Sequence, residues 1–183
     1  MIPLIVVGVI VLILVIWLIV SYNKLVSEKL KVEDQWSQID VVLKQRADVI
    51  PNLVNTVKGY AGHEKELLEN VTQARSQYLN AGSQREAIQA SDALSQLLNR
   101  LMAVAEAYPD LKANNNFMEL QRQIHNLEEK IADFRQFYND TVLRYNRRIE
   151  LFPSNIVARL FHFQREDFFK VEEADKTVPD VQF

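Results

Sequence analysis

The three histidines are the side chains best suited to hold a metal or move a proton, but their surroundings support neither role. They are His63, His125 and His162, and the residues three positions earlier are Tyr60, Arg122 and Arg159. A di-iron bundle site would require glutamate at two of those earlier positions. A zinc-protease helix would need a second histidine one turn after His63-Glu64, where the chain has Leu67. We therefore expect no metal and no cofactor, with His63 opening a helix and His125 facing solvent.

Nucleophilic and carboxylate chemistry are equally unsupported. The chain has no cysteine, no Gly-x-Ser-x-Gly turn and no glycine-rich phosphate loop. Asp40 and Asp48 are the nearest approach to a carboxylate pair, but two helical turns separate them by about 12 Å. Most other carboxylates alternate with Lys and Arg, as solvated helix faces do. We predict no catalytic residues and no enzyme activity.

One polar block, residues 46–60, interrupts an otherwise apolar helical pattern. Arg46 occupies an apolar position, where an unpaired buried charge would cost several kcal/mol. We expect it to find an acidic or amide partner on another helix. Pro51 should kink the helix and leave a backbone carbonyl free, around which Asn52 and Asn55 could form hydrogen bonds. The block is either a docking surface for a partner or a structural kink held by a polar network, and its candidate residues are Arg46, Asp48, Pro51, Asn52, Asn55, Lys58 and Tyr60.

The elements that must position this block are helices with a seven-residue apolar repeat. Two such lines are Trp36, Leu43, Ile50 and Val57, and then Phe117, Ile124, Ile131, Tyr138, Tyr145 and Phe152. In the second line the repeated Tyr-Asn pairs predict core tyrosines with asparagines alongside. With breaks at Gly59 and Gly62, at 80–83 and at Pro109, helices are expected over about 24–58, 64–78, 84–107 and the 35 or so residues before Pro153.

These lengths predict an all-α fold in which residues 24–152 form an antiparallel up-and-down four-helix bundle with long first and last helices. A long coiled-coil dimer is the alternative, but the turn at 80–83 favours closure within one chain. Only 4 glycines occur in 183 residues, which also favours long helices over sheets.

Residues 1–23 contain no charged side chain, and Leu4 to Val20 are apolar apart from Gly8. About 20 such residues span the hydrocarbon core of a bilayer. No basic residue precedes the run and no small-residue cleavage pair follows it, so a transmembrane anchor is favoured over a signal peptide. Three lysines after the run, Lys24, Lys29 and Lys31, place the soluble body in the cytoplasm by the positive-inside rule. We expect a single-pass protein of the cell membrane.

The remaining segment, 153–183, should lie close to the membrane, because two outer helices of equal length return the chain to its starting level. Its aromatic and basic residues either lie in the headgroup region or cap the open end of the bundle core. The candidate membrane-surface residues are Arg159, Phe161, Phe163, Arg165, Phe168, Phe169 and Lys170. Either arrangement places the segment beside the base of the first helix, near Leu25 and Val32.

Several sequence blocks resemble the LemA family of bacterial membrane proteins. They include YNKLV at 22–26, WSQIDV at 36–41, RADVIPNLVNTVKGY at 46–60, YPDLKAN at 108–114, FYNDTV at 137–142 and FPSN at 152–155. The resemblance covers the whole chain and implies one N-terminal membrane span, a four-helix antiparallel domain and no established catalytic activity. The family's association with membrane metalloproteases implies a membrane protease as a partner, and its magnetosome relatives imply a membrane-organising role.

Two functions remain open. The chain is either a non-catalytic scaffold or adaptor for another membrane protein, or a self-associating protein that shapes or organises membrane, and the second would make it a homo-oligomer. The partners expected are the lipid bilayer and an unidentified membrane protein. A net charge of −3 gives no basic surplus, so nucleic acid is not expected to bind.

Overall fold

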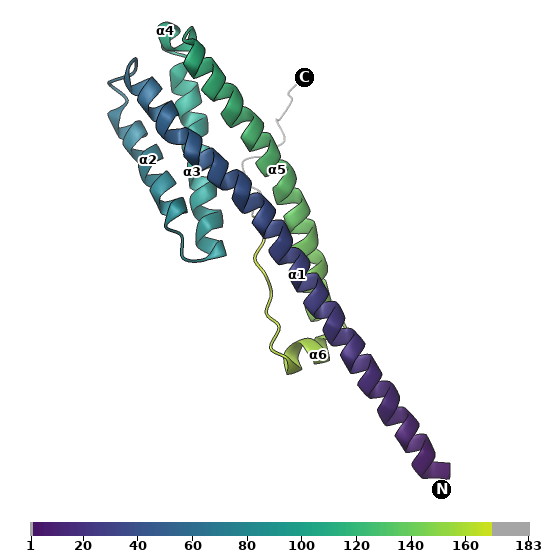
Figure 1. Cartoon of the computed structure of the whole chain (residues 1–183). Helices are drawn as coiled ribbons and strands as arrows, with labels where there is room; N and C mark the ends of the chain where they lie inside the picture. Colours follow the sequence, from purple (N-terminus) through teal and green to yellow (C-terminus); the bar gives the residue numbers. More distant parts are fainter. Residues whose placement is uncertain (1, 170–183) are drawn as a thin grey trace, which may run out of the picture. The chain divides into compact units, whose positions relative to one another are not determined.

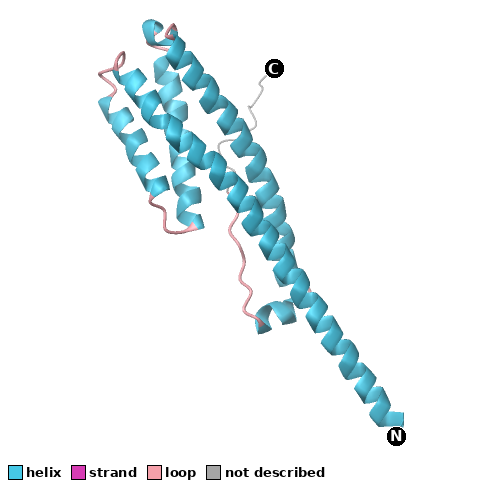
Figure 2. Ribbon diagram, in the orientation of Figure 1, coloured by secondary structure: helices cyan, strands magenta, loops and turns pink. Residues whose placement is uncertain are grey.

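The computed structural model describes residues 2–169, and these are helical apart from short connections and one stretch near the end (Figures 1 and 2). The helices are α1 (Ile2–Lys58), α2 (Lys65–Leu79), α3 (Gln84–Ala105), α4 (Pro109–Lys112), α5 (Asn115–Glu150) and α6 (Ser154–Leu160). No strand occurs in the described part of the chain. The all-α class is therefore confirmed.

The chain divides into two compact units. The central unit is residues 35–136, and the terminal unit is residues 2–34 together with 137–169 of the described chain. The predicted functional division into an anchor (1–23), a bundle (24–152) and a C-terminal segment (153–183) remains a prediction.

The central unit has an apolar core to which all of its helices contribute. α2 and α3 lie side by side (Figure 1), and Ser83 caps α3 by accepting a hydrogen bond from the Glu86 backbone amide. The fully or nearly fully buried core residues include Ile50, Leu53, Val57, Val71, Leu94, Leu98, Leu101, Leu111, Phe117 and Ile124. These include most of the positions that the seven-residue repeat predicts in this unit.

Trp36 and Phe152 depart from the predicted burial. Trp36 is only half-buried, because it lines a surface hollow of about 360 Å³ beside the turn that precedes α3. Phe152 is 80% exposed, because α5 ends at Glu150 and the residues after it no longer follow the helical repeat. Both residues lie at the outer ends of their apolar lines.

The helix ends fall close to the predicted positions. α1 ends at Lys58, just before Gly59, and α2 and α3 begin within one residue of the expected starts. The helices α4 and α6 were not predicted. Each is at most seven residues long, which is too short to show an apolar repeat.

In the terminal unit, the first half of α1 carries a row of exposed apolar side chains. From Ile2 to Ile16 the large apolar residues are each about half exposed or more. This part of α1 is long and apolar enough to cross a membrane. An apolar surface of this extent requires an apolar cover.

The base of α1 is covered by α6. Leu25 of α1 forms a small buried cluster with Val157 and Ala158 of α6. α6 ends where His162 takes a left-handed backbone conformation (φ 57°) and the Phe163 amide donates to the Ala158 carbonyl at 2.9 Å. The chain from 163 to 169 then has no regular secondary structure. α6, which begins the predicted membrane-proximal segment, therefore lies beside Leu25, as predicted.

Candidate partner-binding and membrane-surface sites

Arg46 is completely buried and bonded to two other helices of the central unit. Its Nη1 donates to Glu128 Oε1 of α5 at 2.7 Å and to Ser95 Oγ of α3 at 2.6 Å. Its Nη2 donates to the hydroxyl and the carbonyl oxygen of Ser91, at 3.0 and 3.2 Å. The prediction of an acidic partner on another helix is confirmed. Since Arg46 is inside the fold, it supports the candidate surface and does not form part of it.

The network extends to a second arginine. Arg135 Nη2 donates to Ser91 Oγ at 3.1 Å and forms an ion pair with Asp92 at 2.7 Å. Burial lowers the pKa of Arg135, and the nearby Arg46 charge lowers it further, while Asp92 and Glu128 oppose that shift. Two like charges thus share the Ser91 hydroxyl, and carboxylates from two helices balance them.

Pro51 removes one hydrogen bond from the middle of α1, and another helix supplies the replacement. A residue other than proline at position 51 would donate its N–H to the carbonyl of Ala47, four residues earlier. In the structure that carbonyl accepts from Arg75 Nε of α2 at 2.6 Å. The freed carbonyl was predicted, but the donor was not. Asn52 and Asn55, the expected donors, are exposed because they lie on the outer face of α1.

The other residues of the 46–60 block form an exposed surface. Asp48, Asn52, Asn55 and Lys58 are exposed, and Pro51 is half-buried. Tyr60 is 43% exposed, and its hydroxyl accepts a hydrogen bond from Asn114 Nδ2 at 2.9 Å. Asn114 Oδ1 also accepts from the Phe117 amide at the start of α5. Tyr60 is therefore held in place from the turn between α4 and α5.

A groove lies between the last turns of α1 and the outer face of α2. Its volume is about 630 Å³, and it is lined by Val54, Lys58, Gly62, Lys65, Leu68, Glu69, Thr72, Gln73 and Ser76. Val54 and the nearly buried Leu68 supply apolar surface. Lys58 and Lys65 are exposed cations beside it, and Lys65 lies 3.6 Å from the exposed Glu69 carboxylate of the same lining.

The described residues offer no group of three or more His, Asp or Glu side chains that could hold a metal ion. His63 is exposed in the connection before α2, and His125 is exposed on α5, 3.5 Å from Glu129. His125 therefore faces solvent as predicted, whereas His63 lies two residues before the helix that it was expected to open.

In the terminal unit, the candidate membrane-surface residues divide into two groups. Phe169 is buried, with its ring edge-on to Tyr138 at 5.5 Å, and Phe163 is half-buried near Leu25. The remaining described members, Arg159, Phe161, Arg165 and Phe168, are exposed, although Phe161 contacts the Tyr22 ring at 4.7 Å and Arg165 pairs with Glu150. Lys170 lies outside the described residues.

Two asparagines of α5 hold the 163–169 stretch by its backbone. Asn146 donates to the Glu166 carbonyl at 2.9 Å and accepts from the Glu166 amide at 3.0 Å. Asn139 makes the same pair of bonds to Phe169, both at 2.9 Å. Seven helical residues rise about 10.5 Å, and three extended residues span about 10 Å, so the two spacings match. The Tyr-Asn repeat was noted in the sequence, but this backbone clamp was not predicted.

The tyrosines of the same repeat are fully buried, as expected. Tyr138 donates its hydroxyl hydrogen to the Asp167 carbonyl at 3.0 Å, and burial raises its pKa well above the usual value. The Tyr145 hydroxyl has no hydrogen-bond partner among the described residues, and burial raises its pKa to about 12. Glu166, held by Asn146, has its carboxyl pKa raised by burial and by Glu33, while Lys29 opposes the shift.

Together these observations define a class: an all-helical protein with one apolar N-terminal helix long enough to span a membrane. Residues 35–183 match the LemA family, and the chain therefore belongs to that family. It is 24% identical to magnetosome protein MamQ 2 of Paramagnetospirillum magneticum, over 87% of this chain and 68% of that protein. It is also 24% identical to protein LemA of Metamycoplasma hominis, over 87% of this chain and 73% of that protein.

Proposed function

We propose that this chain is a non-catalytic, single-pass membrane scaffold or adaptor that binds another membrane protein through the groove between α1 and α2. The observation that carries the proposal is the groove itself, which combines apolar surface with the exposed cations Lys58 and Lys65. The bond from Arg75 to the Ala47 carbonyl joins the two helices that form it, and Arg46 ties α1 to α3 and α5. Such fixed surfaces bind partners with little ordering cost.

The anchor in this proposal is the exposed apolar part of α1, with the body on the cytoplasmic side. The charge-free run up to Tyr22 and the lysines that follow it support both statements. The shared apolar core supports an antiparallel four-helix bundle as the anchored body. The partner is a membrane protein with an acidic, partly apolar segment near the bilayer, and a membrane protease is the partner we consider first.

Affinity purification from intact membranes tests this proposal. Lys58→Glu/Lys65→Glu reverses the charge of the groove, and Arg100→Glu/Lys130→Glu makes the same charge change elsewhere on the central unit. We expect one partner to be retained by wild type and by the control pair, and to be lost with the groove pair. Equal retention by all three proteins would refute the groove as the binding surface.

A second function is favoured by the relatives named magnetosome proteins. In this alternative the chain self-associates and organises membrane. It predicts that the same purification yields tagged and untagged copies of this chain together, and that the reconstituted protein changes vesicle shape.

A further inference from the structure

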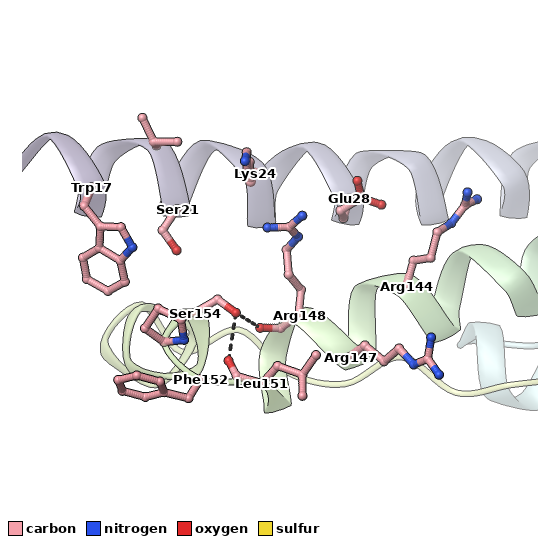
Figure 3. Close-up of a pocket in the computed structure, with 12 residues that line it drawn as sticks. Trp17, Ser21, Lys24, Glu28, Arg144, Arg147, Arg148, Leu151, Phe152 and Ser154 are labelled. Atoms are coloured by element: carbon pink, nitrogen blue, oxygen red, sulfur yellow. Dashed lines mark hydrogen bonds between the residues drawn. The ribbon is translucent and has the colours of Figure 1, made fainter.

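A second hollow lies in the terminal unit, between the base of α1 and the end of α5 (Figure 3). Its volume is about 500 Å³. Four cations line it, and they are Lys24, Arg144, Arg147 and Arg148. No sequence pattern pointed to a role for the three arginines. The apolar part of the lining is Trp17, Val20, Leu151, Phe152 and Pro153.

In the described part of the chain, the charges of these four cations are not balanced by ion pairs. In residues 2–169, none of the four lies within ion-pair distance of a carboxylate. Glu28 is the one carboxylate of the lining, and one of its oxygens accepts from Lys31 at 2.9 Å. Figure 3 shows Arg148 extending from α5 toward the stretch of α1 that carries Lys24 and Glu28. The dipole of α5 favours Arg147 and Arg148 in its last turn, but it does not explain Lys24 on another helix or the apolar residues of the lining.

The hollow lies at the level where α1 changes from apolar to charged. Trp17 and Val20 end the apolar run, and Lys24 is the first charged side chain of the sequence. In a helix that spans a bilayer, this transition falls at the headgroup region, where tryptophan is also enriched. Next to it, Leu151, Phe152, Ile156 and Leu160 are more than half exposed. The cations of the hollow therefore lie next to apolar side chains. In a bilayer, this is the depth at which the lipid phosphates lie next to the acyl chains.

We propose that this hollow binds the phosphate of an anionic phospholipid, with Arg147, Arg148 and Lys24 on the phosphate and Trp17 beside the acyl chains. Arginine binds phosphate oxygens in pairs through its planar guanidinium. The proposal rests on the membrane placement of α1 made above. It is independent of the groove between α1 and α2.

Fluorescence of Trp17 in reconstituted full-length protein tests the proposal directly. The chain has two tryptophans, so Trp36→Phe leaves Trp17 alone. The protein is placed in phosphatidylcholine vesicles that contain phosphatidylglycerol, with bromine on the acyl chains of one lipid or of the other. We expect brominated phosphatidylglycerol to quench Trp17 about fivefold more effectively than brominated phosphatidylcholine at equal mole fraction, the factor that corresponds to about 1 kcal/mol of charge attraction.

Two variants with the same charge change separate this site from general attraction. Arg147→Gln/Arg148→Gln should abolish the preference, and Arg100→Gln/Lys130→Gln, exposed on the central unit and outside the hollow, should retain it. Loss of the preference in both, or in neither, would overturn the proposal. So would loss of the preference on adding inorganic phosphate but not chloride of equal ionic strength, because the hollow would then take free phosphate.

If neither lipid quenches Trp17, this residue lies outside the bilayer. The membrane placement of α1 would then be wrong, and the lipid site that depends on it would be refuted. Partner capture by the groove is a separate measurement. A protein that retains its partner but shows no lipid preference would therefore refute only this inference.

Discussion

At the scale of single residues, Arg46 shows how a charge can be accommodated among apolar neighbours. Its position in the repeat made a partner necessary, and the partner proved to be Glu128, with two serines of α3. The necessity could be predicted from the sequence because burial of an unpaired charge is too costly. The identity of the partner could not, because spacing along one helix does not show which residue of another helix faces it.

Replacing Arg46 by leucine should therefore destabilise the protein by about 3 kcal/mol, since Glu128 and the serines lose their donor. Urea unfolding followed by circular dichroism measures the change. Adding Glu128→Leu should recover part of the loss, because the stranded carboxylate is then gone. An unchanged midpoint for Arg46→Leu would show that the network contributes nothing to stability.

Because the Tyr145 hydroxyl is buried, we predict that the folded protein loses stability at alkaline pH. Its pKa is about 12 in the folded protein against about 10 in an unfolded chain. A raised pKa means that the folded state retains the proton longer, so this contribution to stability is complete below pH 10 and falls as the pH rises from 10 to 12. Urea unfolding at a series of pH values should show a smaller fall for Tyr145→Phe. Identical slopes for both proteins would contradict a buried, neutral hydroxyl.

At the scale of elements, Pro51 and Arg75 link α1 to α2 through one carbonyl. A double-mutant cycle tests this link. Pro51→Ala supplies an N–H for the Ala47 carbonyl, so Arg75→Met should cost about 1 kcal/mol in the wild type and clearly less in the Pro51→Ala background. Thermal or urea unfolding of the four proteins gives the coupling. If Arg75→Met lowers the stability equally in both backgrounds, Arg75 does not act through the Ala47 carbonyl.

The position of segment 163–169 could not be predicted from sequence patterns. It has no period of its own, and its attachment depends on side chains of α5 that bind backbone groups, which carry no sequence signal. The long helices were predictable because the apolar repeat extends over several turns and because Gly59, Gly62 and Pro153 mark the breaks.

Removing either asparagine of this attachment should release the segment. Asn139→Ala and Asn146→Ala should each accelerate hydrogen exchange at the amides they bind, those of Phe169 and Glu166. Asn126→Ala, an exposed asparagine of the same helix, is the matched control. Unaltered exchange in both clamp variants would mean that packing of Phe169 alone holds the segment.

At the scale of the whole molecule, the chain combines a membrane-length apolar helix with helical units that have their own buried clusters. A fragment that lacks residues 1–23 should therefore remain soluble and mostly helical by circular dichroism, with one cooperative thermal transition. If the fragment is unfolded, residues 1–23 belong to the fold and the predicted division of the chain is wrong.

The central claim is that the protein acts through contact at the groove between α1 and α2. Site-specific photocrosslinking in intact membranes tests it most directly, with the crosslinker at Gln73 inside the groove and, as control, at the exposed Asn99 of α3. We predict a single crosslinked product from position 73, containing another membrane protein, that disappears with Lys58→Glu/Lys65→Glu and is not formed from position 99. Products formed equally from both positions, or none from position 73, would contradict the account.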